Sequence, residues 1–213
     1  MTRAASLYLS LALAGLLASS ACKVDGTTVV ADSGGDHDQV SDPKATLDNS
    51  TIELAEPADP SVTYAAWFRA VAKKYPHKKP AEILDDLVAE TPGEEGKWFA
   101  AAKGAKLFDE AIALANRTPC SPQTLSRAAR DFEEKKPEFA IEAGMAALRW
   151  LVEGYGYDIT GLDVLDAYSH TMKAAENAGC AEETQRRIHD LVARESFGER
   201  FVTKVLGRQL GLS

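Results

Sequence analysis

The sequence is short of the residues and motifs from which most catalytic and metal sites are built. None of His77, His170 and His189 has a second histidine or a cysteine three or four residues away to share a metal. No His-Glu-x-x-His pattern, phosphate-binding glycine loop or nucleophile-elbow motif occurs. His170 lies one helical turn after Asp166, which favours a surface pair. The sequence therefore predicts no metal site, no catalytic residue and no cofactor.

The apolar run at the N-terminus is too short to cross a membrane. Residues 7–17 make a run of 11, whereas a spanning helix needs about 20. Arg3 precedes this run, and the small residues 18–21 follow it, directly before Cys22. A basic start, a short apolar stretch and a small-residue end are typical of a cleaved secretion signal.

This N-terminus resembles the signals of bacterial lipoproteins, in which small residues precede a cysteine that is diacylated and becomes the mature N-terminus. It departs from that pattern at Ser19, where the family usually has a branched apolar residue. The resemblance implies that residues 1–21 are removed and that lipid on Cys22 anchors the protein in the bacterial envelope. We expect the outer membrane, facing the periplasm or the cell surface. Ordinary secretion, with cleavage after Ala21, is the alternative.

Residues 22–61 combine a strong acidic excess with a complete lack of aromatic side chains. From residue 23 onward, nine acidic side chains oppose two lysines, which gives a net charge of −7. Such a segment cannot bury enough apolar surface to offset the entropy cost of ordering, so we expect a disordered tether behind the lipidated cysteine. Residues 62–213 then carry only −2 and no sustained basic stripe, which argues against nucleic acid as a partner.

Residues 62–213 suit a single domain, and their apolar residues recur three and four apart, the period of amphipathic helices. The third predicted helix, residues 94–116, is either one helix or two helices separated near Gly104. The predicted helices cover residues 62–75, 81–90, 94–116, 122–135, 137–153, 160–179, 181–195 and 198–209. Alanine is abundant on their apolar faces, which lets helices approach closely. We expect an all-α domain of seven or eight helices, either an irregular α-solenoid of helical hairpins or an irregular helix bundle.

Two features of this domain are candidates for function or covalent structure. The glycine-rich loop before residue 160 displays Tyr155, Tyr157 and Asp158, either as an interaction loop or with tyrosines that cover the end of the core. Cys120 and Cys180 are the two cysteines left after lipidation, and an even pair in an oxidising compartment indicates a disulfide. Because three predicted helices separate them, that disulfide would exclude a simple up-and-down bundle.

One acidic pair near the C-terminus, Glu195-Ser196, is similar to the Glu-Ser of lytic transglycosylases, but the Gly-Leu-Met-Gln stretch of that family is missing. We therefore interpret it as a helix end, with Glu195 exposed and Ser196 capping the last helix. The sequence thus favours a non-enzymatic scaffold that binds another envelope protein. The alternative is an envelope hydrolase, for example one acting on the cell wall, with a site assembled from distant residues.

Overall fold

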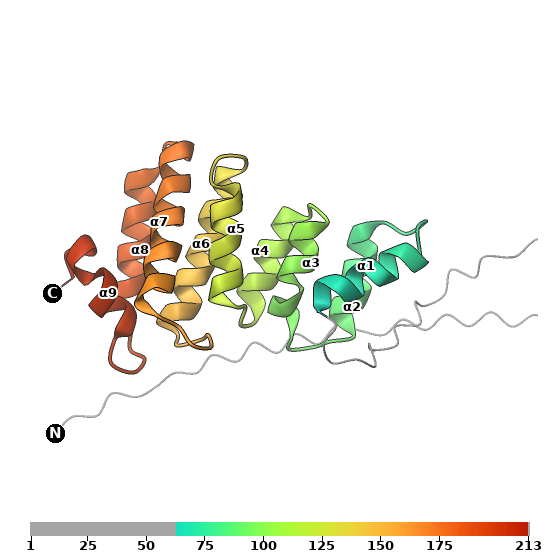
Figure 1. The fold of residues 1–213 in the computed structure, drawn as a ribbon, viewed down its shortest axis with the longest axis horizontal. Coiled ribbons are helices and arrows are strands. Elements are labelled where there is room, and N and C mark those ends of the chain that lie inside the picture. Colours follow the sequence, from blue (N-terminus) through green and yellow to red (C-terminus); the bar gives the residue numbers. More distant parts are fainter. Residues whose placement is uncertain (1–62, 213) are drawn as a thin grey trace, which may run out of the picture. The chain divides into compact units, whose positions relative to one another are not determined.

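The computed structural model describes residues 63–212, which form nine α-helices and one 3₁₀-helix without any strand (Figure 1). The all-α prediction is therefore confirmed. The predicted signal sequence, Cys22 and the predicted tether lie outside the described residues. The helices are α1 (Tyr64–Lys74), α2 (Pro80–Ala89), η1 (Glu95–Trp98), α3 (Phe99–Gly104), α4 (Phe108–Arg117), α5 (Pro122–Phe132), α6 (Pro137–Val152), α7 (Gly161–Ala178), α8 (Ala181–Ala193) and α9 (Phe201–Leu210).

Local signals decide where several helices begin. Pro80, Pro122 and Pro137 are the first residues of α2, α5 and α6, where a missing N–H costs nothing. Thr160 and Asp163 form a capping box at the start of α7: each side chain accepts a hydrogen bond from the other residue's backbone N–H. These starts agree with the sequence because each depends on residues within one turn.

The predicted helix over residues 94–116 is divided. After η1, α3 ends at Gly104 and α4 begins at Phe108. Lys106 lies between them with a φ of +65°, a left-handed conformation that an α-helix does not contain. The break near Gly104 is one of the two alternatives that the sequence left open, and it raises the number of α-helices in the described residues to nine.

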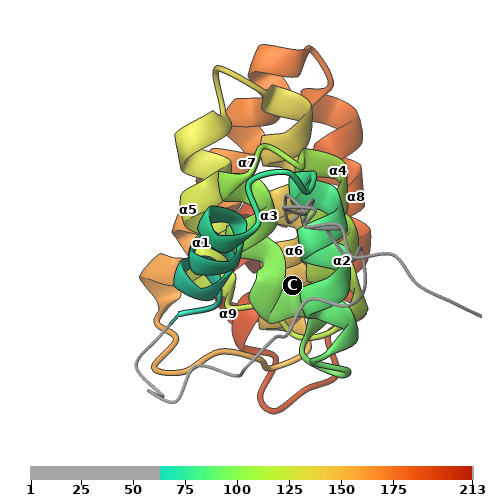
Figure 2. The ribbon, with the colours of Figure 1, turned by 90° about the vertical axis from the view of Figure 1, so that its right-hand side faces the viewer.

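Consecutive helices pack as pairs, α1 with α2, α3 with α4, α5 with α6 and α7 with α8. Successive pairs join through further contacts, including α1 with α3, α5 with α7 and α4 with α6. Seen along the row of pairs, α1 and α5 lie on one side and α2, α4 and α8 on the other (Figure 2). The paired helices differ in length, from six residues in α3 to 18 in α7. An irregular helix bundle, one of the two predicted architectures, describes this arrangement.

A glycine lets α6 and α7 approach closely. A Cβ built on Gly144 would lie 1.9 Å from the Oγ1 atom of Thr171 on α7. Thr171 is fully buried, and its hydroxyl donates to the Ala167 carbonyl at 2.6 Å. This contact holds α7 against α6, and α7 also contacts α5, so the faces of α5 and α7 that form the site below are held side by side.

Candidate functional site

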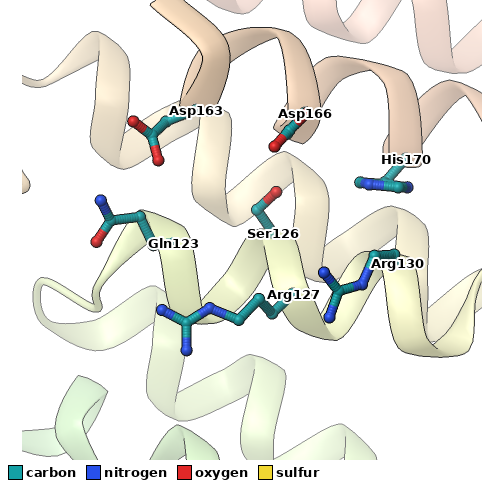
Figure 3. A pocket seen from close by; sticks show the side chains of 7 residues that line it. All are labelled: Gln123, Ser126, Arg127, Arg130, Asp163, Asp166 and His170. Carbon is teal, nitrogen blue, oxygen red and sulfur yellow. The ribbon is translucent and has the colours of Figure 1, made fainter. Parts of the chain in front are cut away.

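A polar cleft of about 310 Å³ lies between α5 and α7 (Figure 3). Its lining residues recur three or four apart on each helix, so each set occupies one helix face. The side chains that line it are Gln123, Ser126, Arg127 and Arg130 from α5, and Asp163, Asp166 and His170 from α7. Asp163 and Asp166 lie on one side, the two arginines lie on the other, and Ser126 lies between them.

His170 stands at one end of the cleft and is held by a carboxylate. Its Nδ1 atom lies 2.8 Å from Oε2 of Glu133, which follows the end of α5. The Asn177 amide donates to the Glu133 backbone carbonyl at 2.8 Å, which joins α7 to the same turn. The predicted pairing of His170 with Asp166 is therefore wrong, because α5 brings a carboxylate closer than the neighbouring turn of α7 does.

A histidine positioned by a carboxylate is one part of a general-base arrangement. Ser126 is in the same cleft, yet no hydrogen bond joins its hydroxyl to His170 among the described residues. An activated serine requires that contact with its base. The cleft therefore has polar groups suited to binding, and no assembled nucleophile.

At the other end of the cleft, Asp163 is already engaged in capping. The hydroxyl and the N–H of Thr160 donate to Asp163 Oδ2 at 2.7 and 2.8 Å. These two hydrogen bonds hold the pKa of Asp163 below its usual range, so the carboxylate stays charged. Asp166, one turn further along α7, is exposed and makes no ion pair with any residue in the described range 63–212.

The predicted interaction loop lies where α6 leads into α7. Tyr157 is 85% exposed and Tyr155 is 45% exposed, and Asp158 is also exposed. The large apolar side chains that are exposed in residues 63–212 all lie on this loop, on the first turn of α7, or where α8 leads into α9. We call this group the aromatic end: Tyr155, Tyr157, Leu162, Phe197 and Phe201.

The two loops of the aromatic end touch at a glycine. A Cβ built on Gly154 would lie 2.3 Å from the Phe197 ring, so Phe197 packs directly on this backbone. Gly154, with a φ of +80°, ends α6, and the Tyr155 N–H donates to the Trp150 carbonyl at 2.8 Å. The Tyr155 ring then packs edge-on against Trp150 at 5.1 Å. Tyr155 thus partly covers the end of the core, which is one of the two interpretations of this loop. Tyr157 points to solvent, as the other interpretation, an interaction loop, requires.

The structure does not support the predicted disulfide, because Cys120 and Cys180 are both free. Cys120 precedes α5, at the end of the bundle where the α6–α7 loop reaches Pro122. Cys180 follows α7, at the end where Asn177 meets Glu133. The 18 residues of α7 separate these ends by about 27 Å, whereas a disulfide needs Cα atoms within about 7 Å.

Glu195 caps a helix, a role that the sequence did not predict when it suggested an exposed residue at a helix end. It is only 6% exposed, and its carboxylate accepts hydrogen bonds from the N–H groups of Val202 and Thr203 at 2.9 and 2.7 Å. The Thr203 hydroxyl donates a third, at 2.6 Å. Glu195 itself, rather than Ser196, therefore caps the N-terminus of α9 from outside the helix.

Comparison of the chain with protein-family models, curated proteins and solved structures finds no match. Within residues 63–212, no three histidine, cysteine or acidic side chains gather to hold a metal ion, and no helix has the length and hydropathy of a membrane span.

Sequence reasoning missed most residues of the cleft and of the aromatic end. The cleft had one local signal, the spacing of Arg127 and Arg130 on one helix face and of Asp163 and Asp166 on another. That spacing does not reveal that the two faces oppose each other. Phe197 and Phe201 follow a helix end and carry no signal that they join the tyrosine loop.

Proposed function

We propose that this protein is an interaction module of the bacterial envelope, held at the membrane by lipid on Cys22, which binds another envelope protein through the aromatic end. The observation that carries this proposal is that all five exposed large apolar side chains in the described residues gather on two adjoining loops and the helix starts beside them. Single exposed apolar residues are ordinary, whereas a cluster of them marks an interaction site. The proposal assigns no catalysis to the domain.

The composition of the aromatic end suits a binding surface. Tyrosine and phenylalanine supply large contact areas with few rotatable bonds, so they lose little entropy when they are buried in a partner. Phe197 is fixed over Gly154, and Tyr155 is fixed against Trp150, so part of this surface is already ordered. Tyr157 then forms the most protruding contact.

The charges around the aromatic end favour a protein over a lipid surface. Its exposed rim carries both signs in equal number: Glu153, Asp158, Glu199, Arg194, Arg200 and Lys204. An anionic membrane attracts clustered lysine and arginine, and carboxylates beside them would oppose that attraction. A polar rim of mixed charge around aromatic anchors is typical of protein interfaces.

The acidic segment behind Cys22 supports an anchored binder. Residues 22–61 could reach at most about 130–140 Å when fully extended, far enough for the domain to meet partners away from its anchor. Like charges along the segment repel one another and favour such extension.

Photo-crosslinking in cells tests the partner. A photoreactive residue at position 157 should yield one defined protein adduct, and Phe197→Ser should abolish it. The matched control places the same residue at Lys135, which is exposed in the turn between α5 and α6, at the end of the bundle where Asn177 meets Glu133, and should yield no such adduct. An adduct that survives Phe197→Ser, or vesicle binding lost in Tyr157→Ser without any protein adduct, would overturn the proposal.

Membrane fractionation tests the anchor separately. Cys22→Ala should move the protein from the membrane to the soluble fraction and remove the mass of the acyl chains. If the variant stays in the membrane with an unchanged mass, Cys22 is not the lipid attachment site.

A further inference from the structure

We propose that the cleft between α5 and α7 is a binding site for a small zwitterion of the size of a dipeptide, whose carboxylate meets Arg127 and Arg130 and whose ammonium meets Asp166. This site is separate from the aromatic end and does not depend on the function proposed for it. The proposal rests on the opposed charges of the cleft and on one hydroxyl, that of Ser126, which faces the cleft between them.

The charges of the cleft are available to a ligand. Arg127 makes no ion pair with any described residue, and Arg130 pairs only with its exposed neighbour Asp131 on the same helix, at 3.0 Å. No ion pair of 4 Å or less crosses the cleft between these arginines and Asp163 or Asp166. The two signs therefore face each other across open space (Figure 3).

Ser126 adds a hydrogen-bonding group that faces the cleft. It is only 9% exposed, and its hydroxyl has no hydrogen-bond partner among the described residues. The hydroxyl points between the arginine side and the aspartate side of the cleft. The hydroxyl is open to the cleft, so it can donate to or accept from a polar ligand there.

The balance of charge selects the class of ligand. An anion that binds the arginines lies beside Asp166, and a cation that binds Asp166 lies beside the arginines, so each is opposed by the facing charge. A zwitterion satisfies both sides at once. The volume of about 310 Å³ corresponds to about ten water molecules at ~30 Å³ each, which limits the ligand to a molecule of roughly dipeptide size.

The arginine side of the cleft suits a carboxylate. Arg127 and Arg130 lie three residues apart on α5 and both border the cleft, and each guanidinium can bind a carboxylate through two parallel N–H···O hydrogen bonds. His170, held by Glu133, closes one end of the cleft, and Gln123 closes the other. The cleft is therefore bounded by α5, by α7 and by these two side chains, and it opens to solvent.

Titration of the full-length chain, isotopically labelled for NMR, with glycylglycine tests this inference. Glycylglycine should cause saturable shifts at Ser126, Arg127, Asp166 and His170. N-acetylglycylglycine lacks the ammonium and glycylglycinamide lacks the carboxylate, and each should bind at least about tenfold more weakly.

Variants with matched controls complete the test. Arg127→Gln and Asp166→Asn should each weaken glycylglycine binding by about tenfold or more, whereas Arg186→Gln and Glu183→Gln, exposed on α8 outside the cleft, should leave it unchanged. All four positions are exposed, so the fold is retained in each variant. Absence of saturable shifts, equal binding of the acetylated or amidated peptide, or binding unaffected by Arg127→Gln would each overturn the proposal.

Discussion

Helices α1–α4 and helices α5–α7 differ in the side chains that predominate in their interiors. The first region packs large rings around Trp98, which is fully buried, with Tyr64 edge-on at 4.8 Å and Trp67 at 5.3 Å. The second region also buries Phe139 and Trp150, but it is richer in small residues, with nine buried alanines against four in α1–α4. These nine run along all three helices: Ala128, Ala129, Ala140, Ala143, Ala146, Ala147, Ala167, Ala174 and Ala175.

The two regions bury apolar surface by different combinations of side-chain volume and helix length. The aromatic region has short helices of six to 11 residues, and each large ring buries much apolar surface. In the alanine region, α6 and α7 have 16 and 18 residues and gain contact area by lying close together along their length. The cleft with its opposed charges lies in the alanine region, between α5 and the long helix α7.

The largest effect is expected in the aromatic region. Trp98→Ala should lower the free energy of unfolding by about 3–5 kcal/mol, because it leaves a cavity that the short helices cannot close. It also removes the bond that the indole N–H donates to Thr91 Oγ1 at 2.7 Å. Denaturant unfolding measures this. Tyr157→Ala, at an 85% exposed ring, is the control and should change stability by less than about 0.5 kcal/mol.

The alanine region should instead be destabilised when side-chain volume is added. Gly144→Ala should lower the free energy of unfolding by about 1–3 kcal/mol, since its Cβ would lie 1.9 Å from Thr171 Oγ1. Gly104→Ala, where a Cβ meets nothing within 4 Å, should be neutral or stabilising by up to about 1 kcal/mol. Calorimetric melting of the two variants compares them. Equal melting temperatures would show that α6 and α7 are not closely packed at Gly144.

Helix α9 should depend on one polar side chain more than on packing. Glu195→Ala removes three hydrogen bonds at the start of α9 and should destabilise the protein by about 1–3 kcal/mol. Hydrogen exchange should show the loss of protection concentrated in α9. Glu199→Ala, at an 88% exposed side chain in the same loop, is the control. Undiminished protection of α9 in Glu195→Ala would contradict this assignment.

The smallest effect is a difference in alkylation rate between the two thiols, which involves no change in the free energy of unfolding. Burial raises the pKa of Cys120 to about 12, so its reactive thiolate is scarce at pH 8. In a Cys22→Ser background, Cys180 should be alkylated much faster than Cys120, and the rate at Cys120 should rise steeply with pH. Mass spectrometry after timed alkylation measures both rates. In the unfolded, non-reduced protein both thiols should titrate, and a result of no free thiol would restore the disulfide prediction.

The sequence determined the elements of this protein because helix starts and stops depend on near neighbours. Pro122 and Pro137 start helices, Thr160 and Asp163 cap one, and Gly179 ends the same helix with a φ of +72°. In each case the hydrogen bonds involved join residues within about five positions of each other. Periodicity also determined the all-α class, although it left open whether residues 94–116 form one helix or two.

Only the tertiary structure decided what the surfaces and cysteines do. Ser126 and Asp166 are forty positions apart, and they line one cleft because Gly144 lets α7 pack closely on α6, beside α5. Glu195 became a cap because α9 folds back over it, and Cys120 and Cys180 stayed apart because three helices run between them. These outcomes depend on contacts between segments distant in the chain, and the residues at each position carry no local signal of the partner they will meet.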